Sequence, residues 1–167
     1  SPIAVSDQPQ AFGHVGAVLF CVKLYDTESA AAQLEPLLAD HTVVVTLQNG
    51  VESRQRIGSV IGEERVLAGA AYFPASINAP GEITFKGPIP GKPLVEVGDG
   101  QGDSSQHVKQ LIQELQNAGI AAAVIDDANV MLWEKFCWIA GVSGVTAVTR
   151  QPIGIVRADP DMRSLFA

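Results

Sequence analysis

Apolar runs that alternate with helix-like segments in the first part of the chain predict a parallel sheet. Residues 15–22, 42–47 and 65–72 are short and almost continuously apolar, as expected for strands that are buried on both faces. Residues 26–39 and 51–61 have apolar positions at helical spacing, and an internal proline should kink or shorten the first of these helices. The order strand, helix, strand, helix, strand is typical of a parallel sheet with right-handed crossovers.

The pattern changes in the second half of the chain. Residues 81–86 and 94–98 are short β segments separated by a Gly- and Pro-rich stretch, and they predict an antiparallel extension at the edge of the sheet. Residues 104–118 predict a helix that a glycine closes, and residues 120–125 predict a last short strand. A long helix should begin at Asp126, where several Asp and Asn side chains can cap it.

These elements predict an α/β domain over residues 1–125 and the start of a helical domain over residues 126–167. The 167 residues suffice for one domain, or for one domain and part of another. The composition is 47% hydrophobic but only 6% aromatic, which agrees with an aliphatic core between parallel strands and helices.

Charge and cysteine content exclude several classes of function. The net charge is −7 and the eleven basic residues are scattered, which argues against a nucleic-acid partner. Cys21 and Cys137 lie in apolar runs without metal-ligand spacing, so we expect two buried thiols and no metal site. No signal peptide opens the sequence and no apolar run is long enough to span a membrane, so we expect a cytoplasmic protein.

The chain has no recognisable cradle for phosphate groups. A Gly-x-Gly-x-x-Gly turn after a strand is absent, and the Gly13–Gly16 segment comes before its strand instead of after it. If the protein binds a nucleotide, the phosphate cradle should lie upstream of Ser1.

Two polar side chains follow neighbouring predicted strands. Lys23 ends the first strand and Asn49 lies in the turn after the second, at the sheet edge where ligands of open α/β sheets gather. Lys23 could contact an anion or a ribose, or it could simply be a solvated strand end. Asn49 could offer its carboxamide to a nicotinamide or a substrate hydroxyl, or it could serve only the turn.

Lys135 lies at the start of an unusually apolar stretch. Residues 136–149 contain no charged side chain, which predicts a helix that is buried almost all round. Desolvation would lower the pKa of Lys135 and suit it to proton transfer, although a lysine can also extend its ammonium group to solvent. Lys135, Ile139 and Ser143 share one helix face, so Lys135 and Ser143 could bracket a small polar substrate.

Five short segments follow one another in a characteristic order: VK at 22–23, LQNG at 47–50, PG at 80–81, WEK at 133–135 and TA at 146–147. From about Gly16 to the end of the chain, this order resembles the central portion of the ketopantoate reductases (2-dehydropantoate 2-reductases). The resemblance implies the C-terminal half of a Rossmann-like parallel sheet with an antiparallel extension, running into the first helix of an all-helical domain.

The resemblance also implies roles for individual residues. Lys135 matches the catalytic lysine of the family, while Lys23 and Asn49 match cofactor-site residues, with Asn49 near the nicotinamide and the substrate. Ile139 and Ser143 stand where the family has two substrate-binding asparagines. Ser143 keeps a hydroxyl for substrate binding, and the two replacements suggest a related substrate.

The implied activity is the NADPH-dependent reduction of a small 2-keto acid, 2-dehydropantoate to pantoate or a related compound, by a homodimer in pantothenate biosynthesis. The chain would then be a fragment that is inactive alone. The alternative is a non-catalytic, truncated half-Rossmann module that self-associates and binds no dinucleotide.

Overall fold

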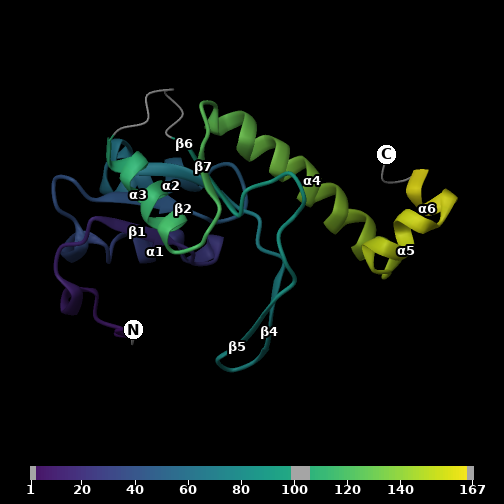
Figure 1. Cartoon of the computed structure of the whole chain (residues 1–167), viewed down its shortest axis with the longest axis horizontal. Coiled ribbons are helices and arrows are strands. Elements are labelled where there is room, and N and C mark those ends of the chain that lie inside the picture. Colours follow the sequence, from purple (N-terminus) through teal and green to yellow (C-terminus); the bar gives the residue numbers. More distant parts are fainter. Residues whose placement is uncertain (1–2, 99–105, 165–167) are drawn as a thin grey trace.

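The computed structural model describes residues 3–98 and 106–164 (Figure 1). Its centre is a five-stranded sheet of order β1-β2-β3-β6-β7. The first three strands, β1 (Ala17–Phe20), β2 (Val43–Thr46) and β3 (Val66–Ala71), are parallel. β6 (Val95–Gly98) runs antiparallel to β3, and β7 (Ala122–Val124) runs parallel to β6. The predicted fold class, a largely parallel α/β sheet with an antiparallel part followed by helices, is confirmed.

Helices cover both faces of this sheet because its strands are apolar on both sides. Val44 and Val45 are neighbours on β2 and both are fully buried, but they belong to different clusters of the core. Val44 packs with residues of α1 (Thr27–Ala31) and α2 (Ser53–Ile61), whereas Val45 packs with residues of α3 (Gln106–Asn117). The predicted start of α3, at residue 104, lies outside the described residues.

The helix predicted over residues 26–39 is shortened at its proline. α1 ends at Ala31, and Pro36 lies in a separate 3-10 turn, η3 (Glu35–Leu37). Proline supplies no backbone N–H for a continuing helix, so this outcome confirms the prediction. The other 3-10 turns are η1 (Pro9–Phe12), η2 (Leu24–Asp26) and η4 (Glu63–Arg65).

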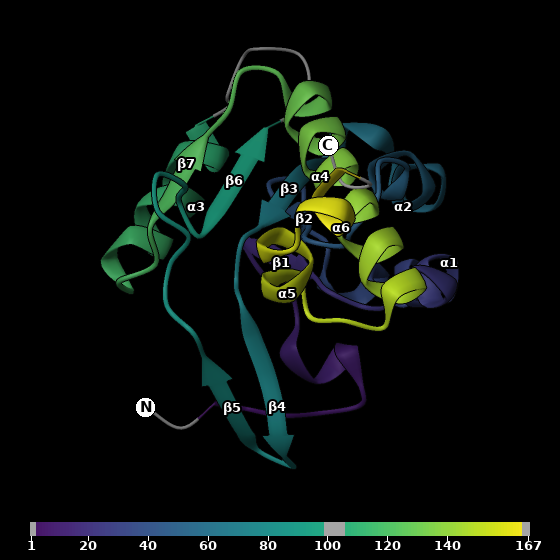
Figure 2. The same cartoon turned by 90° about the vertical axis from the view of Figure 1, so that its right-hand side faces the viewer.

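The antiparallel part of the fold differs in detail from the prediction. Residues 81–86 were expected at the sheet edge, but β5 (Glu82–Phe85) pairs with β4 (Ala75–Ala79) in a separate two-stranded sheet. This hairpin projects from the main body (Figures 1 and 2). β6 instead lies inside the main sheet, between β3 and β7, because its alternate valines complete the core on one face.

α4 (Ala128–Thr149) begins on the sheet and extends beyond it to α5 (Ile153–Ala158) and α6 (Pro160–Ser164) (Figure 1). Its start is capped as predicted, since the Asp127 side chain accepts a hydrogen bond from the Val130 N–H at 3.0 Å. The first turns of α4 pack on β3 through a buried cluster: Ala68, Ala70, Ala128, Met131 and Leu132.

Two predictions about burial are wrong. α4 is not buried all round, since Trp133, Trp138 and Val148 are 53%, 60% and 83% exposed. An apolar helix is covered only where another element packs on it, and the described chain supplies mainly β3 and α5 for that purpose. Cys21, beyond the end of β1, and Cys137, on α4, are likewise exposed. No helix among the described residues is long and apolar enough to cross a membrane.

Candidate active site

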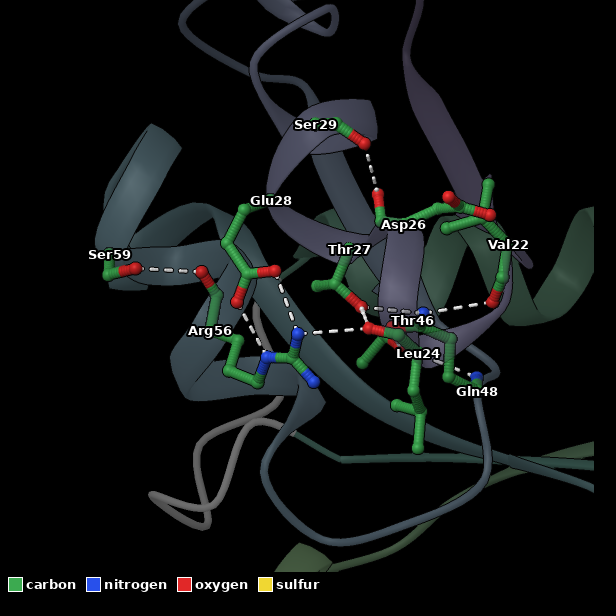
Figure 3. Close-up of polar contacts among 10 residues, drawn as sticks. All are labelled: Val22, Leu24, Asp26, Thr27, Glu28, Ser29, Thr46, Gln48, Arg56 and Ser59. Atoms are coloured by element: carbon green, nitrogen blue, oxygen red, sulfur yellow. Dashed lines mark hydrogen bonds and ion pairs between the residues drawn. The ribbon is translucent and has the colours of Figure 1, made fainter.

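A buried glutamine joins the ends of β1 and β2, where the predicted cofactor residues lie. The Gln48 Nε2 donates hydrogen bonds to the Val22 carbonyl at 2.9 Å and to the Thr27 Oγ1 at 3.0 Å (Figure 3). The Thr46 hydroxyl donates to the Gln48 Oε1 at 3.2 Å. Because Gln48 is only 6% exposed, these bonds are shielded from water and fix the two strand ends relative to each other.

A second contact holds the segment after β1 from the side of α2. The Arg56 guanidinium donates to both Glu28 carboxylate oxygens, at 2.6 and 2.7 Å, and to the Leu24 carbonyl at 2.9 Å (Figure 3). These hydrogen bonds lower the pKa of Glu28 to about 2. The pair is exposed to solvent, so its main effect is to orient the segment and not to add much stability.

Lys23 and Asn49 line one pocket of about 420 Å³ at this end of the sheet, together with Cys21 and Tyr25. Asn49 is followed by Gly50 at φ 101°, a backbone conformation that favours glycine. The turn therefore presents the Asn49 side chain at the sheet edge.

Asn49 also lines a second pocket, of about 250 Å³, which Lys135 lines as well. Tyr72, Trp138 and Ile139 contribute to its walls. The structure therefore brings Lys23, Asn49 and Lys135 into adjoining pockets. They come from the ends of two strands and from α4.

A third pocket, of about 410 Å³, extends from Lys135 toward α5. Three cationic side chains line it, Lys92, Lys135 and Arg157, together with the carboxylate of Glu134. The excess of positive charge in this lining would favour an anionic group on a ligand, whatever the net charge of the chain.

Lys135 is half-buried and faces an aromatic ring. Its Nζ lies 5.4 Å from the centre of the Tyr72 ring, in the geometry of a cation–π contact. Burial lowers the pKa of Lys135, and the Glu96 carboxylate partly opposes this effect. The direction agrees with a lysine tuned for proton transfer.

Glu96 and Tyr72 were not identified from the sequence. Glu96 lies on β6, is 5% exposed, and accepts a hydrogen bond from the Tyr72 hydroxyl at 2.9 Å. It also forms an ion pair with Lys92 at 3.5 Å. The pKa of Tyr72 is raised, mainly by burial and to a smaller extent by the hydrogen bond to Glu96. The signal in the sequence is one glutamate between two valines of a strand that is otherwise apolar.

Ser143 does not share these pockets. It lies two turns after Lys135 on α4, is exposed, and does not line either pocket around Lys135, whereas Ile139 lines one of them. Within the described parts of the chain, no group of three or more His, Cys, Asp or Glu side chains is arranged to hold a metal ion.

Comparison with known proteins identifies relatives of the chain by sequence and by fold. The 2-dehydropantoate 2-reductase of Mesorhizobium japonicum is 28% identical over 99% of this chain and 56% of its own length. The crystal structure of 2-dehydropantoate 2-reductase from Porphyromonas gingivalis W83 superposes with a TM-score of 0.82 at 30% identity, covering 95% of this chain and 55% of that one. The chain thus spans about half the length of these relatives.

A more distant structure, the dimeric ketopantoate reductase from Staphylococcus aureus, shares the fold with a TM-score of 0.73 at 16% identity, over 92% of this chain and 54% of that one. The sequence profile of the family described as "Ketopantoate reductase PanE/ApbA" matches residues 1–99, which is more than half of the chain. The chain therefore belongs to the ketopantoate reductase PanE/ApbA family.

Proposed function

We propose that this chain is the central part of an NADPH-dependent oxidoreductase that reduces 2-dehydropantoate to pantoate, or a related 2-keto acid to its 2-hydroxy acid. The observation that carries the proposal is the series of adjoining pockets from Lys23 through Asn49 to Lys135 in a chain of this family. The substrate of this family is a 2-keto acid, and its cofactor is a nicotinamide dinucleotide.

The pocket at the ends of β1 and β2 fits the nicotinamide half of such a cofactor. Lys23 would contact the ribose or a phosphate oxygen, and the Asn49 carboxamide would contact the nicotinamide. When bound, the cofactor supplies a hydride to the keto carbon. Because Gln48 fixes both strand ends, these two contacts would be largely preorganised.

Lys135 would act as the general acid. Its ammonium group would polarise the keto oxygen and donate a proton to it, a role usually worth roughly 10²–10⁴-fold in rate. Lys92 and Arg157 lie on the same pocket and would attract the carboxylate of a 2-keto acid. Ser143 stays a predicted substrate contact, and its place on α4 requires that the substrate or another part of the protein reach beyond the Lys135 pockets.

The proposal also includes a division into domains and a cellular compartment. Residues 1–125 would form part of the dinucleotide-binding domain, and residues 126–167 would open the helical domain for substrate binding and dimerisation. The core clusters on β1 and β2 contain no residue of α4, whereas the first turns of α4 pack on β3, so the helical part begins on the sheet before it extends away. The two free thiols agree with a reducing compartment such as the cytoplasm.

The experiment is a substrate panel on the full-length protein that carries this sequence. NADPH oxidation should follow addition of 2-dehydropantoate or another branched 2-keto acid. If no branched 2-keto acid is turned over, the pantoate-type substrate is wrong. If no carbonyl substrate is turned over with either NADPH or NADH, the oxidoreductase proposal fails as well.

A further inference from the structure

Glu96 is a buried carboxylate on the face of the sheet that α4 covers. Its neighbours Val95 and Val97 pack into the core cluster with α3, so Glu96 points to the opposite face. Glu96 is paired in register with Ala70 of β3, and Ala70 packs against the first turns of α4. The carboxylate therefore lies on the face of the sheet that α4, the helix carrying Lys135, covers. Figure 2 shows α4 crossing this sheet.

A buried carboxylate in a strand is costly unless it is paired and hydrogen-bonded. Here, Tyr72 donates to one carboxylate oxygen at 2.9 Å, and Lys92 approaches the other at 3.5 Å. An apolar residue at this position would avoid the cost of burying a charge, but it would leave the Tyr72 hydroxyl and the Lys92 ammonium group without this partner. The carboxylate therefore holds two side chains that line a pocket of Lys135.

Tyr72 connects this carboxylate to the candidate acid. The ammonium groups of Lys92 and Lys135 lie 5.3 and 5.4 Å from the centre of the Tyr72 ring. Because the hydroxyl of the same ring is held by Glu96, the position of the ring depends on the carboxylate, and the ring forms part of the wall of both Lys135 pockets.

We propose that Glu96 is a positioning residue for Lys135: it fixes the Tyr72 ring against which the lysine lies, and it supplies a buried counter-charge that favours the ammonium form. The catalytic role of Lys135 in this inference rests on the proposed function, whereas the contacts among Glu96, Tyr72 and Lys135 do not depend on it. Burial lowers the pKa of Lys135 and the Glu96 carboxylate opposes that change, so the carboxylate favours the ammonium form in a half-buried site.

Other charged groups also face Lys135. The cations Lys92 and Arg157 and the carboxylate of Glu134, its neighbour on α4, line the same pocket. Glu134 is exposed to solvent, which screens its effect, whereas Glu96 is buried and is screened much less. Removal of the Glu96 charge should therefore change the protonation of Lys135 more than removal of any exposed carboxylate.

The test measures the protonation of Lys135 directly, by competitive acetylation of the full-length protein across pH with mass-spectrometric readout of the Lys135 peptide. Only the neutral amine reacts, so a lower pKa means faster labelling at neutral pH. Glu96→Gln should increase the Lys135 labelling rate at pH 7 by at least about threefold. Glu82→Gln, an exposed glutamate on the projecting hairpin, is the matched control and should leave the rate unchanged.

An unchanged Lys135 titration in Glu96→Gln, with native circular dichroism, would overturn the inference. This measurement needs neither substrate nor cofactor, so its failure is distinguishable from failure of the proposed activity. If Glu96→Gln does not fold, Tyr72→Phe serves as the second variant. It keeps the ring and the carboxylate but removes their hydrogen bond, and it should lower kcat several-fold without a comparable change in KM. Equal kcat in Tyr72→Phe and wild type would also contradict a positioning role.

The pH profile of turnover gives an independent readout. A general acid is active in its protonated form, so kcat falls as pH rises through the pKa of Lys135. Glu96→Gln lowers that pKa, and the fall in kcat should move to lower pH. If the role of Glu96 is purely structural, Glu96→Gln should reduce kcat at all pH values and leave the pH at which kcat falls unchanged.

Discussion

Lys135 shows what can and cannot be anticipated at the scale of one residue. Its desolvation was predictable, because a lone lysine at the edge of a long uncharged stretch has apolar neighbours along its own helix. Its contact with Tyr72 was not predictable. That contact requires α4 to lie across β3, a tertiary arrangement that no spacing along the chain records.

Lys135→Ala should lower kcat of the full-length protein by roughly 10²-fold or more, the contribution of one general acid. Folding should survive, since the side chain makes no hydrogen bond or ion pair among those found in the described structure. Steady-state kinetics and thermal melting check both parts. Lys86→Ala, at an exposed position after the hairpin, is the control and should behave as wild type. A near-normal kcat for Lys135→Ala would show that Lys135 is a solvated side chain and not the general acid.

Gln48→Ala should destabilise the protein by about 1–3 kcal/mol, because it leaves buried polar partners at Val22, Thr27 and Thr46 without their hydrogen bonds. Denaturant unfolding measures this loss, with the exposed Gln55→Ala on α2 as control. A change in stability no larger than that of the control would show that Gln48 does not join the strand ends.

At the scale of elements, the sequence predicts what local pattern and turn chemistry determine. Strands β1 to β3, the shortening of α1 at Pro36 and the cap at Asp127 follow from apolar runs, a missing N–H and a side-chain oxygen. The pairing of β5 with β4 and the exposure of α4 do not, since they depend on which distant segments are available as partners.

Two glycines provide a matched test of how the elements pack. A Cβ at Gly98 on β6 would lie 2.6 Å from the Ile125 carbonyl oxygen, so Gly98→Ala should destabilise the fold by roughly 1–3 kcal/mol. A Cβ at Gly144 on α4 meets no atom within 4 Å. Gly144→Ala should stabilise the chain by roughly 0.5–1 kcal/mol, as alanine suits a helix interior. Calorimetric melting of both variants measures the difference, and destabilisation by Gly144→Ala would show that α4 is packed more closely at this point.

At the scale of the whole molecule, the described chain combines one well-covered sheet with a helix whose apolar side chains are partly uncovered. Trp133, Trp138 and Val148 are among the exposed side chains of α4. Exposed apolar surface of this kind marks a site of association. The exposed surface agrees with both functional alternatives, an enzyme that dimerises and a non-catalytic module that self-associates.

This chain by itself should bind NADPH very weakly or not at all, and it should form a dimer or a larger species. Much of the affinity for a dinucleotide comes from the pyrophosphate, held at a glycine-rich turn before a helix, and the 167-residue sequence has no such turn. Calorimetric titration and light scattering test both statements. Micromolar binding by a monomer would contradict them.

In the proposed reaction, a hydride passes from the nicotinamide to the keto carbon of a 2-keto acid. The most direct measurement uses the full-length protein, NADPH deuterated at the transferring position of nicotinamide C4, and mass spectrometry of the product. We expect a 2-hydroxy acid that carries one deuterium at C2, formed much more slowly by Lys135→Ala. Unlabelled product, or no product from any 2-keto acid, would contradict it.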